Sequence, residues 1–132
     1  AISAIWYSSR DMGITAARNL LGDNVMFSQG SWYNSAKFLD LEYTSVGHYL
    51  PKSEKEQNIF IKDQQKEVSI RIVHEQNICK GFSMLGSRWD HTVLQRFIDE
   101  QRTVEYFFDN ISKTQFDPEF MNRNLTLKKN SK

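Results

Sequence analysis

The 132-residue chain is predicted to fold as an α+β domain: an antiparallel sheet of three to five strands, two C-terminal helices on one face, and one further helix before the sheet. Three observations lead to this prediction. The length fits one domain. Apolar and polar residues alternate in the middle of the chain, as they do in half-buried strands. Near both ends, apolar residues instead recur at helical spacing.

The first element is a helix, predicted over residues 12–21. Asp11 can cap its start and Gly22 can end it. Its apolar side chains share one stripe, made of Ile14, Ala17 and Leu21 with Ala16 and Leu20 beside it.

The segment after this helix mixes turn-forming residues with large aromatic ones, so residues 22–38 are predicted to be an ordered loop that packs against the domain. A strand is then expected over Phe38–Val46. Pro51 and the charged residues 53–56 mark the next loop.

The middle of the chain is predicted to be a three-stranded antiparallel meander. In its central strand, Val68, Ile70 and Ile72 point to one face while Ser69 and Arg71 point to the other. The flanking strands are expected over Asn58–Lys62 and Ile78–Met84. A half-buried meander needs a helical layer on its apolar face.

Two amphipathic helices supply that layer. Ser87 and Asp90 form a capping-box pattern ahead of the first helix, and Thr103 can cap the second. The apolar residues at helical spacing are Trp89, Val93, Leu94, Phe97 and Ile98 in the first, and Val104, Phe107, Phe108 and Ile111 in the second.

The charge balance and the single cysteine restrict the function classes. A net charge of +1 argues against nucleic acid as a partner. The sequence contains neither an apolar run of membrane-spanning length nor a signal-peptide pattern. Cys79 has no second thiol for a disulfide, which favours a reducing, cytoplasmic setting.

Local motifs point to a binding or assembly module rather than to an enzyme. His48, His74 and His91 lack metal-ligand spacing, and Asp99 and Glu100 read as solvated carboxylates on a helix. The sequence contains no Gly-rich phosphate loop. Clustered aromatic residues either fill the core or cover a face that meets another chain. They are Trp32, Tyr33, Trp89, Tyr106, Phe107 and Phe108.

The order of segments carries further information. Residues 6–22 pass through a Met12-Gly13 step and over small residues to Gly22, and residues 30–47 are an aromatic segment leading into a strand that ends in Gly. Three strands, a GFSMLG step at 81–86 and two helices follow. This succession resembles the C-terminal interface domain of FAD-dependent pyridine nucleotide-disulfide oxidoreductases, nearest to their rubredoxin and ferredoxin reductase branch.

The resemblance implies a division of the chain into residues 1–30, the end of a flavin-binding domain; 31–121, the interface domain; and 122–132, a flexible tail. It also implies a parent enzyme that holds FAD and NAD(P)H, with the hydride chemistry in its N-terminal part. This chain alone is then expected to bind neither cofactor and to be inactive. The implied partners are the parent's own FAD and NAD(P) domains and a second subunit in a homodimer.

The resemblance further implies cofactor-binding residues by position. The amides of Met12, Gly13 and Ile14 would face the flavin from a helix N-terminus, and the ring of Trp32 or Tyr33 would approach it. The alternative interpretation is a free-standing α+β protein-interaction module without catalytic activity. Its aromatic surface would bind a protein or peptide.

Overall fold

The computed structural model describes residues 5–64 and 67–116. A helix, α1 (Trp6–Leu20), is followed by five strands and then by helices α2 (His91–Asp99) and α3 (Val104–Asp109) and a 3-10 turn, η1 (Ile111–Thr114). The tail predicted at 122–132 lies outside the described residues.

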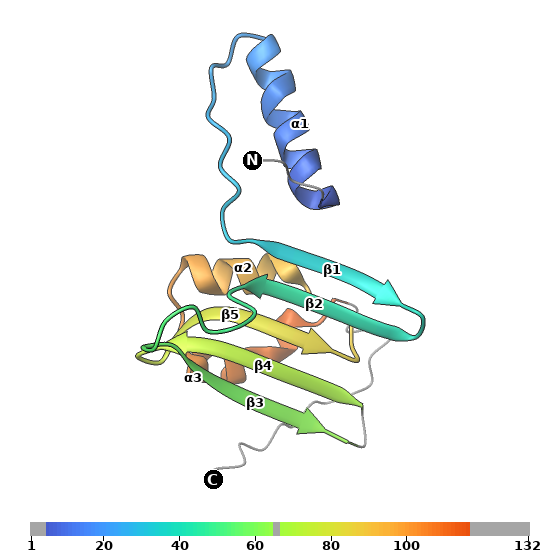
Figure 1. Cartoon of the computed structure of the whole chain (residues 1–132), viewed down its shortest axis with the longest axis vertical. Helices are drawn as coiled ribbons and strands as arrows, with labels where there is room; N and C mark the ends of the chain where they lie inside the picture. Colours follow the sequence, from blue (N-terminus) through green and yellow to red (C-terminus); the bar gives the residue numbers. More distant parts are fainter. Residues whose placement is uncertain (1–4, 65–66, 117–132) are drawn as a thin grey trace.

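The five strands form one antiparallel sheet, which confirms the predicted fold class (Figure 1). Their order across the sheet is β1-β2-β5-β4-β3, so β1 and β3 are the two edges. The strands are β1 (Tyr33–Phe38), β2 (Leu41–Gly47), β3 (Gln57–Asp63), β4 (Val68–Glu75) and β5 (Ile78–Leu85).

The hydrophobic core lies between one face of this sheet and the helices α2 and α3, which cover it as predicted. The alternation of β4 puts Ile70 and Ile72 into the core, and Arg71 on the open face. Helix α2 contributes Leu94 and Phe97. The remaining core residues include Val46, Phe82, Met84, Trp89, Val104 and Phe107.

The capping of α2 differs from the prediction, whereas that of α3 agrees. Asp90 is the N-cap of α2, and its carboxylate accepts hydrogen bonds from the amides of Thr92 (2.8 Å) and Val93 (3.3 Å). Ser87 is buried ahead of the helix, so the predicted capping box is wrong. Thr103 caps α3 by accepting from the amide of Tyr106 at 3.2 Å.

The predicted loop at 22–38 is wrong in its second half, because residues 33–38 form β1. A two-residue turn at Leu39–Asp40 joins β1 to β2, with Phe38 opposite Leu41. The single strand expected over 38–46 is therefore one arm of a hairpin. The first half of the predicted loop is an ordered connector, as expected, held to α1 by hydrogen bonds, although much of it, including Met26, is exposed.

The surplus of aromatic residues in the C-terminal helices fills the core. Trp89 and Phe107 are fully buried, and Tyr106 and Phe108 are partly buried against them. Phe107 packs on the rings of Phe82 and Phe108, with centroid distances of 5.1 and 5.4 Å. The interpretation of these rings as an exposed contact surface is therefore wrong, and the core-filling alternative holds.

Candidate interaction interface

Helix α1 is joined to the sheet by its first turns. The ring of Tyr7 packs against Tyr33 at 4.6 Å and against His91 at 5.6 Å between ring centroids. Its hydroxyl donates to the carbonyl of Ser35 on the β1 edge at 3.4 Å. Arg10 donates to the hydroxyl of Tyr33 at 3.2 Å. The rest of the helix extends away from the sheet (Figure 1).

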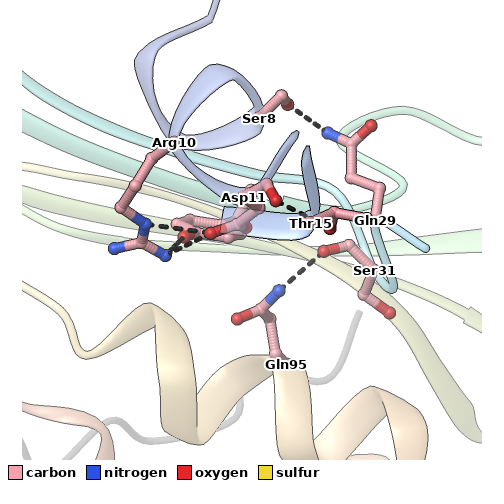
Figure 2. A network of polar contacts seen from close by, with 8 residues as sticks. Ser8, Arg10, Asp11, Thr15, Gln29, Ser31 and Gln95 are labelled. Carbon is pink, nitrogen blue, oxygen red and sulfur yellow. Dashed lines mark hydrogen bonds and ion pairs between the residues drawn. The ribbon is translucent and has the colours of Figure 1, made fainter. Parts of the chain in front are cut away.

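The connector between α1 and β1 runs back beside the helix, and polar contacts hold it there (Figure 1). At the far end, Asn19 donates to the Val25 carbonyl at 2.9 Å and accepts from the Val25 amide at 2.6 Å. In the middle, Gln29 donates to Ser8 (Figure 2). Helix and connector therefore form an ordered arm.

At its base, the connector is attached to α2. The side chain of Gln95 donates to the carbonyl of Ser31 at 2.7 Å (Figure 2). The hydroxyl of Ser31 donates to Asp99 at 2.9 Å. These bonds tie the arm to the core helix rather than to the sheet alone.

The face of α1 turned away from this packing is apolar and exposed. Trp6 is 67% exposed, Leu20 89% and Leu21 86%, and Ile14 is also exposed. The spacing of Trp6, Arg10, Gly13, Ala17 and Leu20 is four, three, four and three residues, the repeat with which one helix packs along another. We call Trp6, Gly13, Ile14, Ala17, Leu20 and Leu21 the α1 seam.

Small residues occupy the middle of the seam. A Cβ added at Gly13 would meet no atom within 4 Å, so space above this position is open. Glycine costs a helix interior about 1 kcal/mol relative to alanine, and packing within the domain does not require glycine here. Small side chains do let a second helix approach closely.

Three of the predicted cofactor residues lie in the wrong part of the helix for the predicted role. Helix α1 begins at Trp6, not at residue 12, so Met12, Gly13 and Ile14 lie in its interior. Interior amides donate to carbonyls four residues earlier and are not available to a flavin. The helix-dipole argument for these residues is therefore wrong.

The two aromatic candidates have different surroundings. Tyr33 is 8% exposed and stacks on His91 with 4.3 Å between centroids, so it belongs to the attachment of α1. Trp32 is half-buried, with its ring 5.9 Å from that of Tyr49. It borders an open cleft of about 590 Å³, whose lining includes His48 and the charged residues Lys52, Lys80 and Asp99.

A second cavity, of about 310 Å³, lies beside the base of α1, between the β1–β2 hairpin and Trp89. Its charged lining residues are Lys37, Glu42 and Arg88. Arg88 forms a two-pronged ion pair with Glu42, both bonds measuring 2.9 Å, and this pair holds the pKa of the Glu42 carboxyl below its ordinary value. The pairing is typical of a structural ion pair at a cavity wall.

Two potentially reactive side chains, Cys79 and His91, lie in surroundings that shift their pKa values. Burial raises the pKa of the Cys79 thiol to about 12, which suppresses the nucleophilic thiolate. Burial likewise lowers the pKa of His91, whose ring stacks on Tyr33. Among residues 5–64 and 67–116, no cluster of His, Cys, Asp and Glu could hold a metal ion.

Comparison with known proteins does not assign the chain to a family. The sequence matches no protein-family model, and no curated protein resembles it significantly. Within the part of the chain that the structure describes, no helix is long and apolar enough to cross a membrane. The α1 seam is thus the feature with the clearest functional content. The sequence predicted part of this seam as an apolar stripe of Ile14, Ala17 and Leu21. It did not predict that the stripe is exposed.

Proposed function

We propose that the chain is an interaction domain that docks onto another protein through the α1 seam. The observation that carries this proposal is an ordered helix whose apolar face is exposed while its opposite face is held by the connector. Exposed apolar surface of this continuity is costly in water and is typical of a contact site.

The partner surface that fits the seam is an apolar face of a helix. The four-three spacing matches helix-on-helix packing, and Gly13 and Ala17 permit close approach at the centre. Trp6 and Leu20, at the two ends, supply the large apolar contacts that dominate binding energy. Arg10, on the same line, is bonded to Tyr33 and Asp11, and Arg18 beside the seam is suited to a polar rim.

In its more specific form, the proposal places the partner helix in the FAD and NAD(P) domains of a flavoprotein parent, as the resemblance of the sequence implies. This form of the proposal includes a domain division after residues 30 and 121, a cytoplasmic location and a homodimer. Trp32 is then the aromatic residue that approaches the flavin, because Tyr33 is already packed against His91. The free-standing module is the same proposal with a separate partner chain.

Photo-crosslinking in the cells of origin tests the docking. A photoreactive amino acid at Ala17 should yield one defined crosslinked product, since this position lies in the seam. The crosslinked peptide, identified by mass spectrometry, should come from an amphipathic helix. The same probe at Lys55, an exposed loop position, should yield no product of that mass.

Gly13→Leu provides the matched perturbation. The new side chain enters open space in the free domain, so the helix should be as stable as before, or more stable by up to about 1 kcal/mol. The same side chain would keep a partner helix at a distance, and the crosslink from Ala17 should fall at least tenfold. An unchanged crosslink in a folded Gly13→Leu variant would refute docking through the seam.

A further inference from the structure

We propose that the edge strand β3 binds β3 of a second copy of the chain, in antiparallel register centred on Phe60, so that two five-stranded sheets become one. This surface is separate from the α1 seam. Strand β3 is the last in the sheet order, and β1, beside which α1 is attached, is the first.

The backbone of β3 is an open edge. All seven of its residues pair with β4 on one side, with no shift in register. Within residues 5–64 and 67–116, no strand pairs with the other side. The strand has no proline and no bulge, two devices that commonly block edge pairing. The β1 edge differs, because the Tyr7 hydroxyl already bonds to the carbonyl of Ser35 there.

The sequence of β3, QNIFIKD, has apolar residues on both sides of Phe60 and polar residues at both ends. With Phe60 opposite its own copy, Ile59 faces Ile61 of the second copy on one face of the sheet. Asn58 then faces Lys62, and Gln57 faces Asp63, so no like charges are opposed. Directly opposite residues are the pairs that determine sheet stability, and all of these pairs are compatible.

The neighbouring registers fit less well. Two residues that lie opposite each other must point to the same face of the sheet, so one strand can slip past the other only by two residues at a time. Each such slip moves the centre of symmetry by one residue. Centring on Ile61 sets Phe60 against Lys62 and Ile59 against Asp63. Centring on Ile59 sets Phe60 against Asn58 and Ile61 against Gln57. Of these three registers, only the one centred on Phe60 sets all three apolar residues of β3 opposite apolar residues.

The side chains of β3 also favour continuation of the sheet. Ile59 and Ile61 pack against the core but are only half-buried, so a further strand would cover them. Phe60 is 60% exposed on the open face, beside the guanidinium of Arg71 at 5.9 Å. Across the twofold axis the row would read Arg71, Phe60, Phe60, Arg71, which keeps the two cations apart.

Sedimentation equilibrium over a hundredfold range of concentration tests the proposal. The mass of the wild-type chain should rise from 15.5 kDa towards twice that value. Phe60→Lys places two ammonium groups together at the axis and should raise the dissociation constant at least tenfold. Phe38→Lys is the matched control, because Phe38 is another exposed strand phenylalanine, and it should behave as wild type.

Cysteine crosslinking tests the register. Phe60→Cys, treated with a short-span bis-maleimide, should give a covalent dimer, whereas Phe38→Cys should not. The native thiol is buried and should react little. A monomer at every concentration, or equal effects at positions 38 and 60, would overturn the proposal. Gly13→Leu should leave this dimer intact, which separates a failure here from a failure of the α1 seam.

Discussion

At the scale of single residues, the junction of α1 with the domain depends on three rings in mutual contact. Tyr7, Tyr33 and His91 come from α1, β1 and α2, and the planes of Tyr33 and His91 are within 7° of parallel. Burial is the main cause that lowers the pKa of His91. Arg10 acts in the same direction, and Asp90 opposes it. A neutral imidazole is therefore part of the folded junction.

This predicts a loss of stability in mild acid. The pKa of His91 is lower in the folded state than its ordinary value of about 6.5, so the unfolded state binds the proton more readily. The stabilisation from neutral His91 should be complete above pH ~6.5 and should decline as the pH falls below it. Chemical unfolding at pH 7.5 and 5.5 measures the free energy difference.

His91→Phe is the control, since it retains a ring but cannot titrate. The variant should lose less free energy of unfolding than the wild type between the two pH values. Any contribution from His48 and His74 is common to both proteins and cancels in the comparison. Equal losses in the two proteins would contradict the assignment to His91.

At the scale of elements, the β1–β2 hairpin contains an unfavourable turn residue. Leu39 has a φ of 53°, in the left-handed region that costs a residue with a Cβ about 1–2 kcal/mol. Its side chain is exposed and gains little from burial. Glycine is the residue that hairpin turns of this kind prefer at their first central position.

Leu39→Gly should therefore stabilise the domain. Relief of the backbone strain should outweigh the added entropy of the unfolded chain, for a net gain of about 0.5–1 kcal/mol. For a domain of this size the melting temperature should rise by roughly 2–5 °C. Asp40→Gly in the same turn is the control. Asp40 does not have a positive φ, so this change should lower the melting temperature.

At the scale of the whole molecule, the two proposed contact surfaces lie at opposite ends of the sheet. The α1 seam extends beyond the β1 edge, and β3 forms the other edge (Figure 1). A chain with this arrangement can bind a partner helix and its own copy at the same time. In both forms of the proposed function, the flavoprotein form and the free-standing form, the chain would link its two partners within one assembly.

If the chain is an interaction domain, the purified protein should be colourless and should not oxidise NADH or NADPH. A cofactor of this size needs a nucleotide-binding fold with a Gly-rich turn, and the sequence has no such turn. After incubation with FAD and gel filtration, the absorbance at visible wavelengths should remain at the baseline. About one flavin per chain would contradict this prediction, and its loss in Trp32→Ala would then locate the site.

The sequence alone was sufficient for the parts of the fold that depend on local patterns. Strands β3, β4 and β5 were predicted to within a few residues because strict alternation has one structural meaning. Thr103 was identified as a cap because its hydroxyl oxygen accepts a hydrogen bond from an amide only three residues away in the sequence. The α1 stripe was visible for the same reason, since helical spacing is a property of neighbouring residues.

Tertiary structure decided the features that depend on distant residues. Helix α1 extends back to Trp6, where Ile5 offers no side-chain cap, and Tyr7 in that first turn is packed on Tyr33 and His91. The turn at Leu39 carries no local signal, because the pairing of β1 with β2 imposes its conformation. Packing also decided which apolar residues became core: Trp89 and Phe107 are buried by the sheet. The α1 seam is left exposed because α1 packs on the domain through its first turns and the connector runs along its opposite side (Figure 1).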